Sequence, residues 1–414
     1  MRKLTFLLLW LLVFTIPWEE ALAIPGVGTI SRIVGYSLLF FGFLVVLSQG
    51  NFKRIDGAHV LMAAYVCWCG ATVAWSLDAD YSWERTLTYI RVAGLGWLTW
   101  EFAPTQAEQF KLMKAYVAGC WVPIVSTFWA AWGGRNALAT SAQSRYRGAG
   151  MNENDLAAIL AIGILFAAYL AMVSTFRWKS GRWLCWLFCP AAFLAILLTG
   201  SRTGILALLA GAAVFSVGMA VYFRTKVGAT LALLAMLVPS VYLAPRFVPS
   251  STLQRVRTTG HEIQYGTWSD RRTIYQIGWY AFLDYPVAGV GVGAFYLALY
   301  EKSGWMKDAH STYLNVLVGT GMIGMLFFLA ILFRVLRLVW RLPSRDRFLW
   351  FAVLTAWMVT GVTTSWDYRK VTWFIFGLAL SQAASYLPPV RRAGSVPLRP
   401  AATGLRTRRG VAGG

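Results

Sequence analysis

Apolar segments with almost no charged residue constrain the fold of this chain more than any other feature. Residues 155–173, 204–222 and 347–364 are examples. Each is about as long as a helix must be to cross a hydrocarbon core of roughly 30 Å. In lipid, only helices and closed barrels satisfy the whole backbone, and the alternating pattern of barrel strands is absent. We therefore expect an all-α, polytopic integral membrane protein.

The apolar segments predict about twelve transmembrane helices. They lie near residues 4–17, 28–49, 59–77, 86–103, 112–131, 155–173, 182–199, 204–222, 228–244, 312–333, 347–364 and 371–387. We expect one helical domain over residues 1–387, with a single large connection at about 245–311. Within that connection, residues 274–299 are expected to be amphipathic or partly re-entrant. Residues 388–414 are rich in Pro, Gly and Arg, which predicts a disordered basic tail.

The distribution of Lys and Arg predicts the orientation of these helices. When Arg2 and Lys3 are placed inside, most of the basic connections and the tail are cytoplasmic, and the connection at 245–311 lies outside. The first segment has a second interpretation, because its basic start and the Ala-Leu-Ala at residues 21–23 resemble a cleaved signal peptide. We favour an uncleaved helix, and the sidedness of the later segments is the same in both cases.

The composition argues against nucleic-acid, metal and cofactor sites. Hydrophobic residues make up 58% of the chain and charged residues 13%, so the net charge of +21 fits the basic loops of a membrane protein. We therefore expect no nucleic-acid partner. The five cysteines lie in apolar segments and lack the spacing of metal ligands. Neither a DxD motif nor a P-loop is present, and we expect no metal and no cofactor.

Basic residues on the predicted outer side need an explanation, because short outer loops are usually poor in Lys and Arg. Arg147, Arg202, Arg271 and Arg272 are among them. Arg binds phosphate oxygens bidentately, so a lipid pyrophosphate at the membrane surface is a candidate ligand. The alternative is that the long connection escapes the charge bias.

Arg202 is the sharpest of these candidates. It lies in the sequence Gly-Ser-Arg-Thr-Gly at residues 200–204, a short outer turn at the start of a predicted helix. A cation at this end opposes the helix dipole, whereas a bound phosphate would be stabilised by the arginine and by the free N–H groups. The alternative is an arginine that reaches out to lipid headgroups.

His310 and Arg91 are two further candidates. His310 opens a predicted helix, whose N-terminus disfavours the imidazolium form. A neutral imidazole could accept a proton from a sugar hydroxyl; the alternative is a histidine that donates to a loop carbonyl. Arg91 lies about one turn inside the fourth span, where charges are often functional. Pairing with Glu84 or with lipid phosphate is equally compatible with its position.

Four motifs occur in order between residues 140 and 330. They are Arg147-Gly148 with Asn152 to Ala157; Ser201-Arg202-Thr203-Gly204; Arg271 with Tyr275, Asp284-Tyr285-Pro286 and Gly289 to Phe295; and His310-Ser311 followed, nine residues on, by Gly321-Met322-Ile323-Gly324. Together they resemble the O-antigen ligase and polymerase family of bacterial membrane glycosyltransferases. The last motif is the most specific. Tyr275 stands where the family usually has Trp, a mild departure.

The resemblance implies a metal-independent transferase in the bacterial inner membrane, with its active site facing the periplasm. The implied donor is a glycan linked to undecaprenyl pyrophosphate, and the implied acceptor is lipid A-core or another glycan. Arg202 and Arg271 would hold the pyrophosphate, and His310 would activate the acceptor hydroxyl. The further substrate-binding candidates are Arg147, Asn154, Arg272 and Arg91.

Three activities remain open at this point. An O-antigen ligase acting on lipid A-core is favoured by the short chain, the single large outer loop and the histidine motif. A polymerase of O-antigen or exopolysaccharide is the alternative within the family. A transporter or flippase of lipid-linked glycans is less favoured, because it would need polar residues through the spans, whose central parts are mostly apolar.

Overall fold

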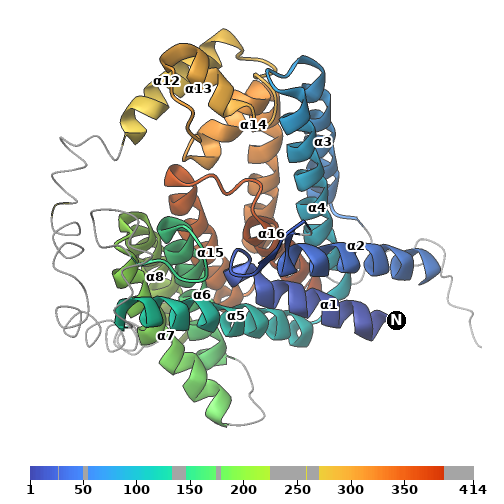
Figure 1. Ribbon diagram of the computed structural model, residues 1–414. Helices are drawn as coiled ribbons and strands as arrows, with labels where there is room; N and C mark the ends of the chain where they lie inside the picture. Colours follow the sequence, from blue (N-terminus) through green and yellow to red (C-terminus); the bar gives the residue numbers. More distant parts are fainter. Residues whose placement is uncertain are drawn as a thin grey trace, which may run out of the picture.

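The computed structural model describes residues 1–26, 28–49, 55–132, 146–173, 179–223, 258 and 270–386. These residues form helices joined by loops, together with one pair of short antiparallel strands, β1 (Ala23–Ile24) and β2 (Gly28–Thr29) (Figure 1). The expectation of an all-α fold is confirmed.

The helices follow the apolar segments of the sequence. Their bounds are α1 Arg2–Thr15, α2 Ile30–Gln49, α3 Gly57–Ala71, α4 Ala79–Phe102, α5 Gln106–Trp132, α6 Glu153–Val173, α7 Lys179–Thr199, α8 Arg202–Phe223, α12 Arg271–Asp284, α13 Phe295–Ser303, α14 Thr312–Val339, α15 Ser344–Thr363 and α16 Lys370–Ser385. Two short 3-10 helices, η1 (Ile16–Trp18) and η2 (Thr72–Trp75), follow α1 and α3.

Eleven of the twelve predicted spans coincide with a helix, and the twelfth, residues 228–244, lies outside the described residues. The predicted tail at 388–414 lies outside them too. Six of the described helices are long and apolar enough to cross a membrane: Ile30–Ser48, Gly57–Trp75, Gln106–Trp132, Glu153–Val173, Ser180–Thr199 and Thr312–Val339. α4 is not one of the six, because Arg85, Arg91 and Glu101 interrupt its apolar sequence.

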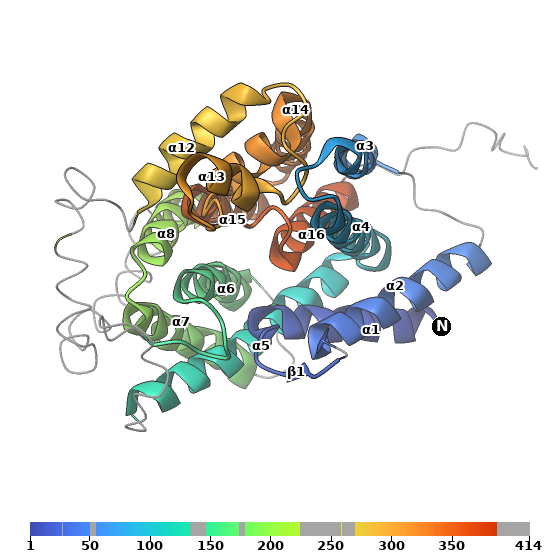
Figure 2. The same ribbon diagram turned by 45° about the horizontal axis from the view of Figure 1, so that its top comes forward.

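α6 occupies the centre of the largest hydrophobic core. It is buried along nearly its whole length and contacts α5, α7, α8 and α15 (Figure 2). Small residues in helix contacts let helices approach closely in lipid. A Cβ added at Gly204 of α8 would lie only 2.2 Å from the Cβ of Ala157 on α6. This glycine therefore places the beginning of α8, and with it Arg202, directly against α6.

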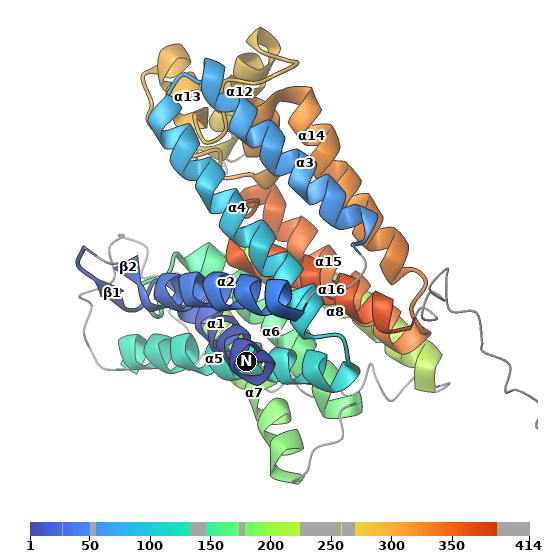
Figure 3. The same cartoon turned by 90° about the vertical axis from the view of Figure 1, so that its right-hand side faces the viewer.

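α14 is interrupted at Gly321, whose backbone (φ 66°, ψ −170°) is in a region open essentially only to glycine. α3 lies beside α14 (Figure 3), and the Trp68 indole N–H on α3 donates to the Thr320 carbonyl oxygen (2.8 Å). The Met322 amide donates to the Pro286 carbonyl oxygen (2.9 Å). Backbone groups at the break thus have partners in the protein.

The glycine-rich segment from Gly289 to Gly293 runs along this break. The Val290 amide donates to the Val318 carbonyl oxygen (3.0 Å), and a Cβ at Gly289 would lie 2.5 Å from the backbone nitrogen of Gly321. The motif that contains Gly289 to Gly293 and the motif that contains Gly321 therefore form one packed unit in the structure, although they are separate in the sequence. The segment serves as a turn that attaches the loop after α12 to α14.

α12 and α13 lie together at one end of the molecule, beside the first half of α14 (Figure 1). α12 buries Ile274, Gly278 and Phe282 on one face and exposes Gln276 and Tyr280. Its amphipathic character agrees with the expectation for residues 274–299. The two helices enclose a second, smaller apolar cluster.

Candidate functional site

The first turn of α8 lies at the carboxyl end of α15. The hydroxyl oxygens of Thr203 and Thr363 are 2.7 Å apart. Ser201 accepts a hydrogen bond from the amide three residues further on (3.2 Å), as a helix N-cap does, and donates to the Asn154 side-chain oxygen (2.8 Å). Arg202 is half-buried between these contacts, and its Nη2 donates to the Thr258 hydroxyl (3.1 Å). Its positive charge therefore sits at a helix N-terminus, where an anion would be stabilised.

Tyr275 joins α12 to the same end of α15. Its hydroxyl lies 2.6 Å from the Val362 carbonyl oxygen and 3.0 Å from the His310 carbonyl oxygen. Arg271 lies one turn earlier, at the i, i+4 spacing that puts two side chains on one helix face. Arg271 is half-buried, and no described residue forms an ion pair with it. Burial lowers the pKa of its guanidinium, against the opposing effect of Tyr275.

His310 immediately precedes the Ser311 N-cap of α14 and has a positive φ of 46°, which is uncommon for a residue with a side chain. Its ring forms no hydrogen bond with the described part of the chain, so the alternative of a histidine that donates to a loop carbonyl is not observed there. Burial and the positive charge of Arg271 lower the pKa of His310, while Asp308 and Asp155 act in the opposite direction. The imidazole is therefore neutral at pH 7.

The contacts at residues 361–364 bring Arg202, Arg271 and His310 into one region, although they lie on three different parts of the chain. The neutral imidazole agrees with the sequence argument, but its cause is burial and the nearby guanidinium rather than the helix end alone. Two cationic side chains and a neutral imidazole in one region are suited to binding an anion and accepting a proton.

Arg147 and Asn154 have structural contacts near this region. The Nε of Arg147 forms an ion pair with buried Glu153 (3.0 Å), so its charge is already balanced. The side-chain oxygen of Asn154 accepts the hydrogen bond from Ser201 and thereby orients the turn that precedes Arg202. Asn154 thus positions the first turn of α8, whereas Arg147 is held by α6.

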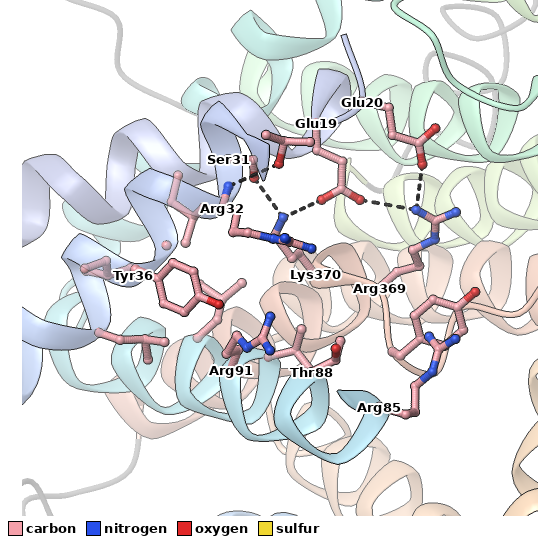
Figure 4. Close-up of a pocket in the computed structure, with 18 residues that line it drawn as sticks. Glu19, Glu20, Ser31, Arg32, Tyr36, Arg85, Thr88, Arg91, Arg369 and Lys370 are labelled. Carbon is pink, nitrogen blue, oxygen red and sulfur yellow. Dashed lines mark hydrogen bonds and ion pairs between the residues drawn. The ribbon is translucent and has the colours of Figure 1, made fainter. Parts of the chain in front are cut away.

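Arg272 and Arg91 lie apart from these contacts. Arg272 is exposed, although it follows half-buried Arg271 directly in α12. Arg91 lines a different cavity, next to α2, where its guanidinium carbon is 5.5 Å from the centre of the Tyr36 ring (Figure 4). The described residues show no ion pair between Arg91 and Glu84.

An ionic network that the sequence analysis did not identify lies next to Asp155. Arg369 contacts Glu20 (2.8 Å) and Asp155 (3.2 Å), and Lys370 contacts Glu19 (2.7 Å). The negative charges raise the pKa of Arg369 although its burial acts in the opposite direction. Arg369 and Lys370 lie in the short connection before the last predicted span. Because such outer loops are usually poor in basic residues, these two cations could have indicated the network from the sequence.

The comparisons with known proteins agree with the motifs. Residues 187–329 match the protein family described as O-Antigen ligase. The matched segment begins within α7, ends within α14, and contains Arg202, Arg271 and His310. The search of curated proteins gives no match. Residues 187–329 are thus similar to the O-antigen ligase family, in agreement with the resemblance to the O-antigen ligase and polymerase family.

Proposed function

We propose that this protein is an O-antigen ligase of the bacterial inner membrane. It transfers a glycan from undecaprenyl pyrophosphate to lipid A-core on the periplasmic face, without a metal. The observation that carries this proposal is the pairing of half-buried Arg271, which has no acidic partner among the described residues, with the neutral imidazole of His310. The family match over the same segment supports it.

The reaction is a direct displacement at the anomeric carbon of the donor. The acceptor hydroxyl oxygen forms the new bond to this carbon while the bond to the pyrophosphate oxygen breaks. His310 takes the hydroxyl proton, and the departing lipid pyrophosphate keeps the electron pair. Arg202 and Arg271 stabilise the negative charge that grows on the leaving group. Both substrates are held at one depth by the membrane, which favours their encounter.

Reconstitution tests this proposal. The purified chain is placed in proteoliposomes with a lipid-pyrophosphate glycan and with lipid A-core, and the products are separated by size. Wild type should form a glycan–lipid A-core product. We expect His310→Ala and Arg202→Ala to lower the rate by roughly 100-fold or more, because each removes a group that acts in the transition state. Arg337→Ala, at the exposed far end of α14, is the control and should retain activity.

The same assay distinguishes the alternatives. A polymerase would lengthen the glycan on its lipid carrier and leave lipid A-core unmodified. Transfer of glycan across the bilayer without any new bond would indicate a flippase. Equal rates in wild type, His310→Ala and Arg202→Ala would contradict the assignment of the site.

A further inference from the structure

A cavity of about 310 Å³ lies between α1, α2, α4 and the beginning of α16 (Figure 4). None of Arg202, Arg271 and His310 lines it. Its volume is within the range of about 300–1,000 Å³ that is usual for ligand pockets. Its lining combines basic and aliphatic side chains.

Basic residues outnumber acidic residues in the cavity. The basic ones are Arg32, Arg85, Arg91, Arg369 and Lys370, and the acidic ones are Glu19 and Glu20. Both carboxylates are already engaged, since Lys370 contacts Glu19 (2.7 Å) and Arg369 contacts Glu20 (2.8 Å). In addition, the Nε of Arg369 is buried and has no hydrogen-bond acceptor within the described residues. The cavity therefore has excess positive charge and an unused donor.

Arg32 and Arg91 form no ion pair with the described residues, whereas Arg85 interacts electrostatically with Asp367. Arg85 and Arg91 also contact aromatic rings: the guanidinium carbon of Arg85 lies 3.7 Å from the centre of the Tyr368 ring, and that of Arg91 lies 5.5 Å from the centre of the Tyr36 ring. A ring stabilises a cation but does not neutralise it. Arg91 is half-buried without a counter-ion among the described residues, which is unfavourable, so this part of the cavity is suited to an anionic ligand.

The aliphatic wall is the apolar part of the lining. It is formed by Leu12, Leu38, Leu39, Val92 and Leu95. Next to it, α2 is one of the six helices apolar enough to cross a membrane, and it exposes Phe40 and Phe43. A ligand that fills the cavity would thus have a charged end and an apolar end. A small water-soluble anion would leave the aliphatic wall unused.

We propose that this cavity binds the phosphate headgroup of an anionic membrane lipid. Arginine suits phosphate because its planar guanidinium contacts two oxygens at once. Arg32 and Arg91 hold the phosphate, and the lipid chain runs along the aliphatic wall toward α2. The inference goes beyond glycan transfer, since it concerns a separate cavity that takes part in no bond-forming step.

Lipid binding to the full chain tests this proposal without donor or acceptor glycan. The purified protein is equilibrated with phosphatidylglycerol or phosphatidylcholine, and the retained lipid is measured by native mass spectrometry. We expect wild type to retain phosphatidylglycerol preferentially. The double variant Arg32→Gln/Arg91→Gln should bind it about ten-fold more weakly, because two charge-assisted contacts are lost.

Two further variants control this comparison. Arg32→Lys/Arg91→Lys keeps both charges but loses the two-oxygen contacts, so it should bind more tightly than the glutamine variant and less tightly than wild type, which separates loss of charge from misfolding. Arg337→Gln removes an exposed arginine at the far end of α14 and should bind like wild type. Equal retention of the two lipids by wild type would overturn the proposal. So would undiminished binding by the glutamine variant, or displacement of the lipid by inorganic phosphate at equal concentration.

Discussion

At the scale of single residues, the protonation of His310 depends on the charges around it. Burial and Arg271 lower its pKa below the ordinary value of 6.5, and Lys307 acts in the same direction, whereas Asp308 raises it. A lowered pKa keeps the imidazole neutral as the pH falls through the range in which a solvated histidine would become charged. An enzyme that uses such a histidine as its proton acceptor loses activity only at a lower pH than one that uses a solvated histidine.

We therefore expect the transfer rate at low donor concentration to fall on the acid side with an apparent pKa below 6.5. Asp308→Asn removes a charge that favours the imidazolium, so it should move this fall to lower pH. Lys307→Gln removes a charge of opposite sign and should move it to higher pH. The measurement is the rate over pH values from about 5 to 8. Shifts with the reverse signs would show that another group controls the profile.

Arg369 should be the most important ion-pairing residue for stability. Its replacement by Met leaves Asp155 and Glu20 without their cation, and breaking a buried pair costs about 3–5 kcal/mol. Because these groups are half-buried, we expect a loss of about 2–3 kcal/mol, measured by denaturant unfolding in detergent. Lys302→Met, which breaks the exposed pair with Asp284, should cost less than about 1 kcal/mol. Equal losses in the two variants would refute this difference.

Part of the candidate site could be predicted from the residues themselves. Arg202 and His310 were identifiable because each stands at the start of an apolar run. Arg271 could not be separated from Arg272 without the family resemblance, because only the rotation of α12 decides which of the two is half-buried. The Arg369 network was missed, because its carboxylates come from distant segments that share no local pattern.

At the scale of elements, the break in α14 positions the glycine-rich segment that follows α12. The hydropathy of residues 312–333 is continuous, so the sequence predicted an unbroken helix there. The interruption arises from contacts with the glycine-rich segment after α12. This segment is separated from Gly321 in the sequence, and the apolar pattern gives no sign of the contacts.

Gly321→Ala should therefore destabilise the protein strongly. Its new Cβ would lie 2.3 Å from the Val287 carbonyl oxygen, and its backbone conformation is unfavourable for any other residue. We expect a loss of at least about 3 kcal/mol. Gly304→Ala is the matched control: it also has positive φ, but nothing lies within 4 Å of the added Cβ, and about 1–2 kcal/mol should be lost. Thermal unfolding followed by tryptophan fluorescence compares the two, and equal effects would contradict the role of the break.

At the scale of the whole molecule, helix positions were predictable because the apolar runs are long. The packing around α6 was not, because it depends on which faces of neighbouring helices carry Gly and Ala. The sidedness remains a prediction from Lys and Arg counts. It requires α13 and the far end of α14 to lie on opposite sides of the membrane.

Cysteine labelling tests this sidedness. Cys67, the exposed native cysteine among the described residues, is first replaced by Ser. Lys302→Cys on α13 should then react with a membrane-impermeant reagent added from the periplasmic side. Arg337→Cys at the end of α14 should react only after the membrane is permeabilised. Labelling of both positions from the same side would contradict the predicted topology.

Donor binding by two variants tests the division of roles within the site most directly. Affinity for the donor, a glycan linked to undecaprenyl pyrophosphate, is measured for wild type, Arg271→Ala and His310→Ala in the same detergent. Arg271→Ala should bind at least about ten-fold more weakly, because a charge-assisted phosphate contact is lost. His310→Ala should bind the donor like wild type and yet transfer glycan more slowly, by roughly 100-fold or more. Undiminished donor binding by Arg271→Ala, or glycan transfer by His310→Ala at the wild-type rate, would contradict the proposed site.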